Sequence, residues 1–488
     1  MCRLVSWILI IAVINPLVTP LALSDELPTM GGGGLVAEQQ ESEIGRRVLI
    51  QLRRNAPLLS DPVAREYLEH VVHSMIPHAP LEDRRMTFVI IDDPSLNAFA
   101  VPGNLIGVNV GLFLNAPSEH QFAGVIAHEI AHLSQRHFAR RLEQQQRSTP
   151  LTIAGMLAGI ALTALSGSQA GIATIAGTQA AAIESMLRHS RAHEEEADRL
   201  GLKILAASGY DPAGMPAMFE RMLKQARLQG NRPPEFLSTH PQTESRVSDT
   251  RARVGDYRDR EHYPQDIAYL LVRNRLRVRY ASDTGEAVSS FRNQYQDQSG
   301  QSAAVARYGL AHALTEHGRP EEAIPHLEAL LADNTGNIFY AAELGRALAE
   351  SGGFEEATEL LEEHLQRSPG NLTLTRTLAD TYLKADNPKR AARFYERLTR
   401  EYGDDPTLWH DLAEAEGRAN RITAVHRARG ERQLLLGNPR VAVREFRQAV
   451  DKASNDHTEI EVLRERLAEA NRRLSRQRNE RSGSAARR

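Results

Sequence analysis

The 488-residue sequence predicts an α+β protein that is mostly α-helical, in which a domain with a small β-sheet precedes an all-α solenoid. Two observations favour this class. Short β-rich runs lie in the N-terminal half, at residues 86–91 and 105–114. In the C-terminal half, residues of similar size recur every 34 positions, which is the period of tetratricopeptide repeats.

The N-terminus has the features of a secretory signal peptide, which we assign to residues 1–24. Arg3 precedes an apolar run from Leu4 to Leu23, and small residues near its end suit signal peptidase, with cleavage expected after Ser24. An asparagine and two prolines interrupt the run, which argues against a retained membrane anchor. Cys2, the only cysteine, lies in this segment, so the mature chain would have no thiol for a disulfide or a metal.

The charge balance is mildly acidic, and most of its asymmetry lies at the C-terminus. A formal net charge of −3 gives no reason to expect a nucleic-acid partner. Residues 471–488 contain seven arginines against one glutamate, and we predict a disordered, solvated tail. The alternative is peripheral contact of this tail with anionic lipid or lipopolysaccharide at a membrane surface.

In the first domain, one predicted helix and two predicted strands precede residue 121. Residues 37–55 predict an amphipathic helix and residues 86–91 a strand. Residues 105–114 predict a second strand and the turn beyond it.

His128-Glu129-Ile130-Ala131-His132 is an H-E-x-x-H motif. Helix positions four apart lie about 40° from each other, so His128 and His132 can bind one Zn²⁺ from the same face. Glu129 lies one position round the helix, where its carboxylate can act as general base on a metal-bound water. The alternative is a solvated helix face with two incidental histidines.

Apolar residues flank the motif and favour the metal site. Residues 121–127 and Leu133 suit a helix that is buried on most faces. A buried helix cannot hold two histidines and a glutamate at low free energy unless a metal or polar partners satisfy them.

A catalytic zinc needs a third protein ligand and leaves its fourth position to water. Downstream, Glu194 and Asp198 are four residues apart, on one face of a second predicted helix. Glu194 is the candidate ligand, and Asp198 the candidate hydrogen-bond acceptor that fixes the tautomer of a ligand histidine. Alone, this acidic run favours a solvent-facing helix turn. Together with the first motif, it favours a site for one zinc ion per chain.

These motifs resemble the M48 family of zinc metallopeptidases, which pair H-E-x-x-H with a downstream R-x-x-E-x-x-A-D. The second pattern is matched by Arg191, Glu194, Ala197 and Asp198. The resemblance covers nearly the whole mature chain, and is most specific to a periplasmic subgroup whose protease domain is followed by tetratricopeptide repeats. It implies a zincin-type metalloprotease domain at 25–258, with Arg191 and Asp198 supporting the ligands.

Asn97-Ala98-Phe99-Ala100 resembles the family's strand beside the catalytic cleft, and these four residues are the expected substrate-binding segment. A strand at a sheet edge can bind an extended peptide by adding it to the sheet, with little dependence on its side chains. The sequence departs from many relatives at Gly103-Asn104, where they have Gly-Gly, which leaves the shape of that turn open.

Ser238-Thr239-His240-Pro241, followed by Arg246, matches a later T-H-P…R segment of the family. The resemblance implies that His240 lies near the zinc and fills its open position, which keeps the enzyme latent. His240 could instead stabilise the oxyanion during hydrolysis, or its imidazole could lie on the surface before Pro241. Arg246 is expected to support the metal ligands.

Two further histidines are not expected to bind the metal. His137 follows His132 by five residues, about 140° further round the helix, so we expect it to support the site or the fold. His193 is expected to be solvated.

Between the two zinc motifs lies an apolar segment at residues 151–182. Its run from Leu151 to Leu165 is shorter than the roughly 20 residues that a spanning helix needs. We predict a helical hairpin that covers the cleft, with a membrane span as the alternative.

The repeat domain is predicted at residues 264–455. Its positions recur 34 residues apart in four registers, which begin at Ala311, Gly318, Ala323 and Leu327. Asp386 takes the third turn position of the second register. A later unit around Gly430 and Phe446 is offset by 17 residues, about one helix. Such solenoids present a concave surface for other proteins.

The sequence therefore predicts a metalloendopeptidase with Zn²⁺ bound by His128, His132 and Glu194, and with Glu129 as general base. The resemblance implies a periplasmic enzyme of outer-membrane protein quality control, with an additional chaperone activity, acting on misfolded or stalled outer-membrane proteins. It also implies the β-barrel assembly machinery as a partner of the repeats. The alternative is an assembly chaperone or binding module whose peptidase site is latent.

Overall fold

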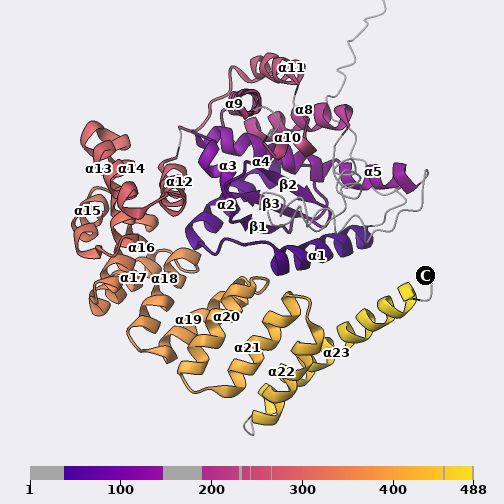
Figure 1. The fold of residues 1–488 in the computed structure, drawn as a ribbon, viewed down its shortest axis with the longest axis vertical. Coiled ribbons are helices and arrows are strands. Elements are labelled where there is room, and N and C mark those ends of the chain that lie inside the picture. Colours follow the sequence, from indigo (N-terminus) through magenta and orange to yellow (C-terminus); the bar gives the residue numbers. More distant parts are fainter. Residues whose placement is uncertain are drawn as a thin grey trace, which may run out of the picture.

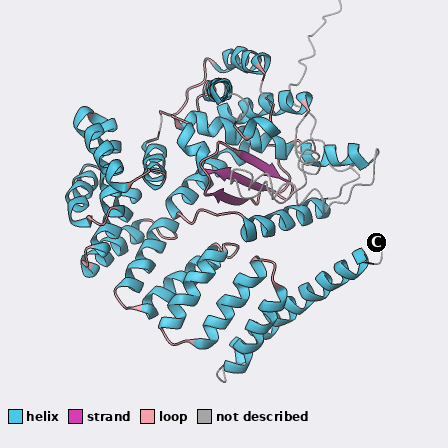
Figure 2. Ribbon diagram, in the orientation of Figure 1, coloured by secondary structure: helices cyan, strands magenta, loops and turns pink. Residues whose placement is uncertain are grey.

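The computed structural model describes residues 38–146, 190–229, 234–241, 243–264, 266–453 and 457–485. The predicted signal peptide at 1–24 and the predicted hairpin at 151–182 lie outside these ranges. Helices surround a three-stranded sheet in the first domain (Figure 2), and the solenoid curves round one side of that domain (Figure 1). None of the described helices combines the length and hydropathy that a bilayer span requires.

The first domain contains α1 (Glu38–Asn55), α2 (Pro62–Met75), a 3-10 turn (Ile76–His78), β1 (Thr87–Ile91), β2 (Ala98–Val101), β3 (Leu105–Asn109), α3 (Val110–Asn115), α4 (Glu119–Ser134), α5 (His137–Gln146), α8 (Arg191–Ala207), α9 (Gly214–Gln229), α10 (Phe236–Thr239), α11 (Glu244–Val254) and a second 3-10 turn (Gly255–Tyr257). The first predicted helix and strand are confirmed, and each begins one residue later than expected. Only the first half of the run at 105–114 forms a strand. The turn expected after this strand is instead the short helix α3.

β3 is the central strand, parallel to β1 and antiparallel to β2, so β2 lies at the edge of the sheet. The turn between β2 and β3 contains Gly103 and Asn104, whose φ angles are 80° and 59°. Asparagine adopts this left-handed conformation more readily than other side-chain-bearing residues. Its Nδ2 also donates a hydrogen bond to the carbonyl oxygen of Asp83 at 2.9 Å. Asn104 therefore suits this turn although it carries a side chain.

α4 is the buried helix around which the first domain is built. Ser118 caps its start by accepting a hydrogen bond from the Gln121 amide, and residues 122–132 of the helix are all buried. α8 and α9 pack along α4, and β2 lies beside it. A Cβ atom at Gly201 of α8 would lie 3.2 Å from the Cα atom of His128. Glycine at this point lets the two helices approach closely enough for their polar residues to meet.

The solenoid contains α12 (Ile267–Arg279), α13 (Thr284–Asp297), α14 (Gly300–Glu316), α15 (Pro320–Asp333), α16 (Ile338–Glu350), α17 (Phe354–Arg367), α18 (Leu372–Lys384), α19 (Pro388–Glu401), α20 (Pro406–Arg418), α21 (Ile422–Leu435), α22 (Pro439–Lys452) and α23 (His457–Ala485). The predicted turn positions Gly318, Gly352 and Asp386 all have positive φ, at 75°, 89° and 53°. The aspartate therefore takes the place of a turn glycine.

The 17-residue offset of the last unit has a structural cause. A Cβ at Gly345 of α16 would meet Leu361 of α17, and one at Gly430 of α21 would meet Phe446 of α22. α21 therefore contacts α22 through a glycine as α16 contacts α17, one helix out of the 34-residue register.

The disorder predicted for the basic tail is wrong for residues 471–485, which continue α23. Leu463 and Ala470 of this helix are buried, and Ala470 packs in a cluster with residues of α21 and α22. Arg472 and Arg473 both pair with Glu469 within the helix. Apolar residues at helical spacing and ion pairs one turn apart stabilise the helix in spite of its arginine content.

A largely buried ion network joins the two domains. Arg275 of α12 donates through Nε to Asp61, the N-cap of α2, at 2.9 Å, and it also pairs with Glu343 of α16. His312 of α14 lies 2.9 Å from the same glutamate. Burial alone would lower the pKa of Arg275, but the carboxylates of Asp61 and Glu343 raise it well above its ordinary value. The guanidinium therefore stays charged and holds the solenoid against α2.

We expect Arg275→Met to lower the thermal unfolding midpoint by about 5 °C, because it leaves Asp61 and Glu343 with fewer cationic partners in a buried site. Differential scanning calorimetry measures the shift. Arg292→Met is the control, since that arginine is 44% exposed and lies 3.9 Å from Glu322, a pair of little consequence for stability. Equal midpoints for both variants would contradict a stabilising role for the network.

Candidate metal centre

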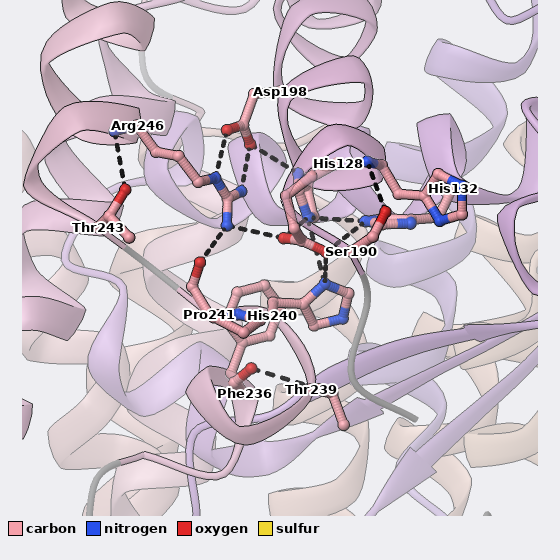
Figure 3. Close-up of polar contacts among 12 residues, drawn as sticks. His128, His132, Ser190, Asp198, Phe236, Thr239, His240, Pro241, Thr243 and Arg246 are labelled. Atoms are coloured by element: carbon pink, nitrogen blue, oxygen red, sulfur yellow. Dashed lines mark hydrogen bonds and ion pairs between the residues drawn. The ribbon is translucent and has the colours of Figure 1, made fainter. Parts of the chain in front are cut away.

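The polar residues of four helices meet at the crossing of α4 and α8 (Figure 3). α4 contributes His128, Glu129 and His132, and α8 contributes Glu194. His240, directly after the short helix α10, approaches from the opposite side. Each of these five residues is at most 4% exposed. His240 is therefore buried, and the surface position that the sequence left open for its imidazole is not observed.

Four of these side chains could hold a metal: His128, His132, Glu194 and His240 each offer one ligand atom within 4.8 Å of the others. The Nε2 atoms of His128 and His132 are 3.0 Å apart. His240 Nδ1 lies 3.4 Å from His128 Nε2 and 3.2 Å from Glu194 Oε1. Glu194 Oε1 lies 3.5 Å from His132 Nε2.

These spacings fit a tetrahedral ion. Zinc bonds of about 2.0–2.1 Å at the tetrahedral angle separate neighbouring ligand atoms by roughly 3.3 Å, and the measured separations lie on both sides of that value. Imidazole and carboxylate are also the donors that zinc takes in hydrolytic enzymes. Both carboxylate oxygens of Glu129 are buried without a hydrogen-bond partner among the described residues, which leaves them available to a water molecule at the centre.

The electrostatics of the cluster are those of a metal site. Burial would lower the pKa of His128, but Asp198 and Glu194 raise it to about 9. Burial opposes ionisation of Glu194 too, yet its pKa lies well below the ordinary value because His240, His128 and Arg246 surround it. Burial raises the pKa of Glu129. A metal ion would therefore bind a preformed carboxylate and displace a proton from His128.

A carboxylate orients the first histidine of the cluster. His128 Nδ1 lies 3.1 Å from Asp198 Oδ1. Arg246 in turn holds Asp198 through two hydrogen bonds of 2.7 Å, from Nε and Nη2. Its Nη1 lies 2.8 Å from Glu194 and donates to the carbonyl oxygen of Pro241 at 2.7 Å. Arg246 therefore connects both acidic residues of α8 to the loop that carries His240.

His132 is oriented by another histidine. The tautomer of His132 that leaves Nε2 available to a metal has its hydrogen on Nδ1, which then donates to His137 Nδ1 at 2.9 Å. His137 then donates through Nε2 to Glu196 at 3.0 Å, and Arg140 holds that carboxylate at 3.0 Å. Burial lowers the pKa of His137 to about 4, which keeps the ring neutral, as an accepting Nδ1 requires.

His193 completes this arrangement, although the sequence predicted it to be solvated. It is 6% exposed, and its ring stacks on His137 at 4.4 Å between centroids with an interplanar angle of 12°. Sequence reasoning also missed Glu196 and Arg140. Their only signal was position: Glu196 lies two residues after Glu194 and thus on another face of α8, where it meets α5 instead of the metal.

Other predicted residues lie further from the ligands. Arg191 is exposed at the first residue of α8, away from the residues that it was expected to support. Arg246 contacts Glu194 and Asp198 instead. Asn97 and Ala98 are buried, and Phe99 covers Gly107 of β3, where an added Cβ would meet its ring at 2.0 Å. Ala100 lines a small hollow together with His132. The edge strand therefore lies next to the cluster.

We expect Glu196→Ala to weaken metal binding about tenfold, because it removes the acceptor that orients His137 and, through it, His132. Competition with a chromophoric chelator measures the affinity without reference to activity. Glu196→Gln should recover part of the loss, since its amide oxygen still accepts a hydrogen bond. Glu195→Ala, at an exposed neighbouring position, is the control, and an equal effect of both alanine variants would contradict the positioning role.

Comparison with known proteins agrees with this geometry. The model for "Peptidase family M48" matches residues 62–254, and two tetratricopeptide repeat models match residues 308–371 and 348–416. The beta-barrel assembly-enhancing protease of Escherichia coli (strain K12) is 34% identical over 85% of each chain. A putative beta-barrel assembly-enhancing protease of Vibrio cholerae is 38% identical over 91% of this chain and 92% of its own. A mitochondrial metalloendopeptidase of Arabidopsis thaliana is 31% identical over 34% of this chain and 31% of its own.

Proposed function

Because the chain is a metallopeptidase of family M48, we propose that it is a zinc-dependent endopeptidase in which His128, His132 and Glu194 bind the metal. Zinc in such a site supplies a Lewis acid that polarises the scissile carbonyl and acidifies a bound water. The observation that supports this proposal most directly is the buried set of ligand atoms at tetrahedral spacing, with Glu129 beside it.

Glu129 is the proposed general base. Its two oxygens are buried without hydrogen-bond partners among the described residues, and burial raises its pKa above the ordinary value. A carboxylate with a raised pKa takes a proton from the attacking water and returns it to the leaving amine more readily than an ordinary one. The neighbouring edge strand, with Asn97, Ala98, Phe99 and Ala100, would hold the substrate backbone.

Glu129→Gln should lower casein cleavage by at least 100-fold and leave zinc content unchanged, because it removes the base and retains the ligands. Cleavage is followed by release of labelled peptides, and zinc by elemental analysis. Retention of cleavage would exclude Glu129 as the base. Loss of zinc would instead assign it a role in binding the metal.

His240 is the proposed cause of latency. Its Nδ1 lies at the spacing of a fourth ligand, the position that the catalytic water requires, and its Nε2 lies 3.5 Å from Glu129. The ring also stacks on Phe236 at 4.5 Å. In this arrangement the segment after α10 would have to move before a water could enter.

His240→Ala should therefore raise casein cleavage severalfold while zinc remains bound by the other three ligands. Initial rates at matched zinc content measure the effect. A loss of cleavage would assign His240 to oxyanion stabilisation, and an unchanged rate would contradict both roles.

The broader role follows from the relatives and the repeats. The names of two relatives connect those proteins with β-barrel assembly, and we propose that this protease is periplasmic and acts on misfolded or stalled outer-membrane proteins. The solenoid would recruit these clients and the β-barrel assembly machinery, because a tethered binding surface raises their local concentration at the active site. A chaperone activity and a peripheral association with the membrane belong to the same proposal.

The second candidate function is an assembly chaperone whose peptidase site stays latent. The position of His240 is the observation that favours it. The Glu129→Gln variant separates the two, since a chaperone would retain its assembly function without the general base.

A further inference from the structure

A groove outside the metal centre lies between α1 of the first domain and the C-terminal end of the solenoid. It encloses about 740 Å³. α1 forms one wall, and α23 forms the other, with Gly437 and the start of α22 between them. Figure 1 shows α1 facing α21 to α23 across this region.

Both walls of the groove are rich in arginine. Five arginines line it against two glutamates, an excess of three positive charges: Arg46, Arg47, Arg54, Arg473 and Arg476 against Glu43 and Glu469. The whole chain has a net charge of −3, so the groove departs from the overall balance. Arg46 and Arg47 share Glu43, and Arg473 pairs with Glu469.

Packing on their far sides holds the walls in place. Ile44, Val48 and Leu52 of α1 are buried in the first domain beneath the sheet, which turns the arginine face of α1 towards the groove. Ile50 contacts Gly437, where an added Cβ would lie 2.5 Å from Cγ2. α23 is anchored to α21 by Arg466, which pairs with Glu431.

The shape of the groove and the spacing of its arginines indicate which kind of ligand would fit. Arg46 and Arg54 are eight residues apart on α1, about 12 Å along the helix axis, which matches three to four residues of extended chain. A single phosphate would engage one end of this row, and a flat bilayer surface would meet the rims of a groove but not its floor. A negatively charged extended chain can follow the whole row.

We propose that this groove binds an extended acidic segment of a polypeptide. The segment would lie between α1 and α23, with its carboxylates paired to arginines of both domains. α1 also contacts the metal-site region, because Glu41 pairs with Arg136, four residues after His132. If the proposed peptidase function holds, a client bound in the groove lies along a helix that reaches the catalytic domain.

The test uses the full-length chain with Glu129→Gln, so that peptides are not cut. The probe is a fluorescein-labelled ten-residue peptide in which aspartate and glutamate alternate with glycine and serine, and its Asn/Gln counterpart is the neutral control. Fluorescence anisotropy in low salt measures binding. We expect the acidic peptide to bind, the neutral one to bind at least tenfold more weakly, and binding to weaken as salt is raised.

Arg54→Glu with Arg476→Glu reverses one charge on each wall, and should weaken binding of the acidic peptide about tenfold. Both positions are exposed. Arg54→Gln with Arg476→Gln should give an intermediate loss. Arg84→Glu with Arg199→Glu makes the same change in net charge at exposed positions outside the groove, and should leave affinity within twofold.

Three outcomes would overturn the proposal. The first is no binding of the acidic peptide, and the second is an equal loss in the groove and control variants. The third is binding of phosphatidylglycerol vesicles, lost in the groove variant, without peptide binding, which would make the groove a lipid site. Binding does not require proteolysis, so failure here leaves the proposed peptidase function standing, and failure of that function leaves this result unaffected.

Discussion

Burial of charged groups at the crossing of α4 and α8 is the constraint on which the rest of the site depends. Carboxylates and imidazoles removed from water cost free energy unless each polar atom has a partner. His128 meets Asp198, His132 meets His137, and Glu194 lies against Arg246. What remains is a set of possible ligand atoms that face one another, together with the carboxylate oxygens of Glu129, which have no hydrogen-bond partner among the described residues. A metal ion would satisfy these atoms.

The two histidines proposed as ligands are oriented by different means. Asp198 acts on His128 directly and is itself held by Arg246, so residues of α8 and α11 support this side of the centre. His132 depends on His137, a residue of α5, which ties the other side to the start of a separate helix. Arg246 also holds the Pro241 carbonyl, so the same residue that stabilises the ligands positions the segment carrying His240.

Much of this centre could be predicted from the sequence, because helical spacing alone places His128 with His132 and Glu194 with Asp198. The long-period repeats were equally accessible, down to Asp386 in the place of a glycine. Contacts between elements distant in sequence could not be predicted in the same way. Glu196 looked like one more solvated acid, and Arg191 matched the family pattern yet lies on the exposed end of α8. For the arginine-rich tail, the prediction relied on composition and overlooked the buried residues Leu463 and Ala470 just before it, which mark the packed face of α23.

The proposed chemistry explains why the protein needs two domains. An edge strand binds substrate through backbone groups and distinguishes poorly between side chains. Any unfolded chain that reaches such a site would be cut, so selection must come from access and recruitment. In the proposed function, His240 at the fourth position of the centre limits access, and the solenoid recruits the clients. The buried pairing of Arg275 with Asp61 and Glu343 then has a mechanical role, because a recruiting surface is effective only when it is held at a fixed position relative to the site that it supplies.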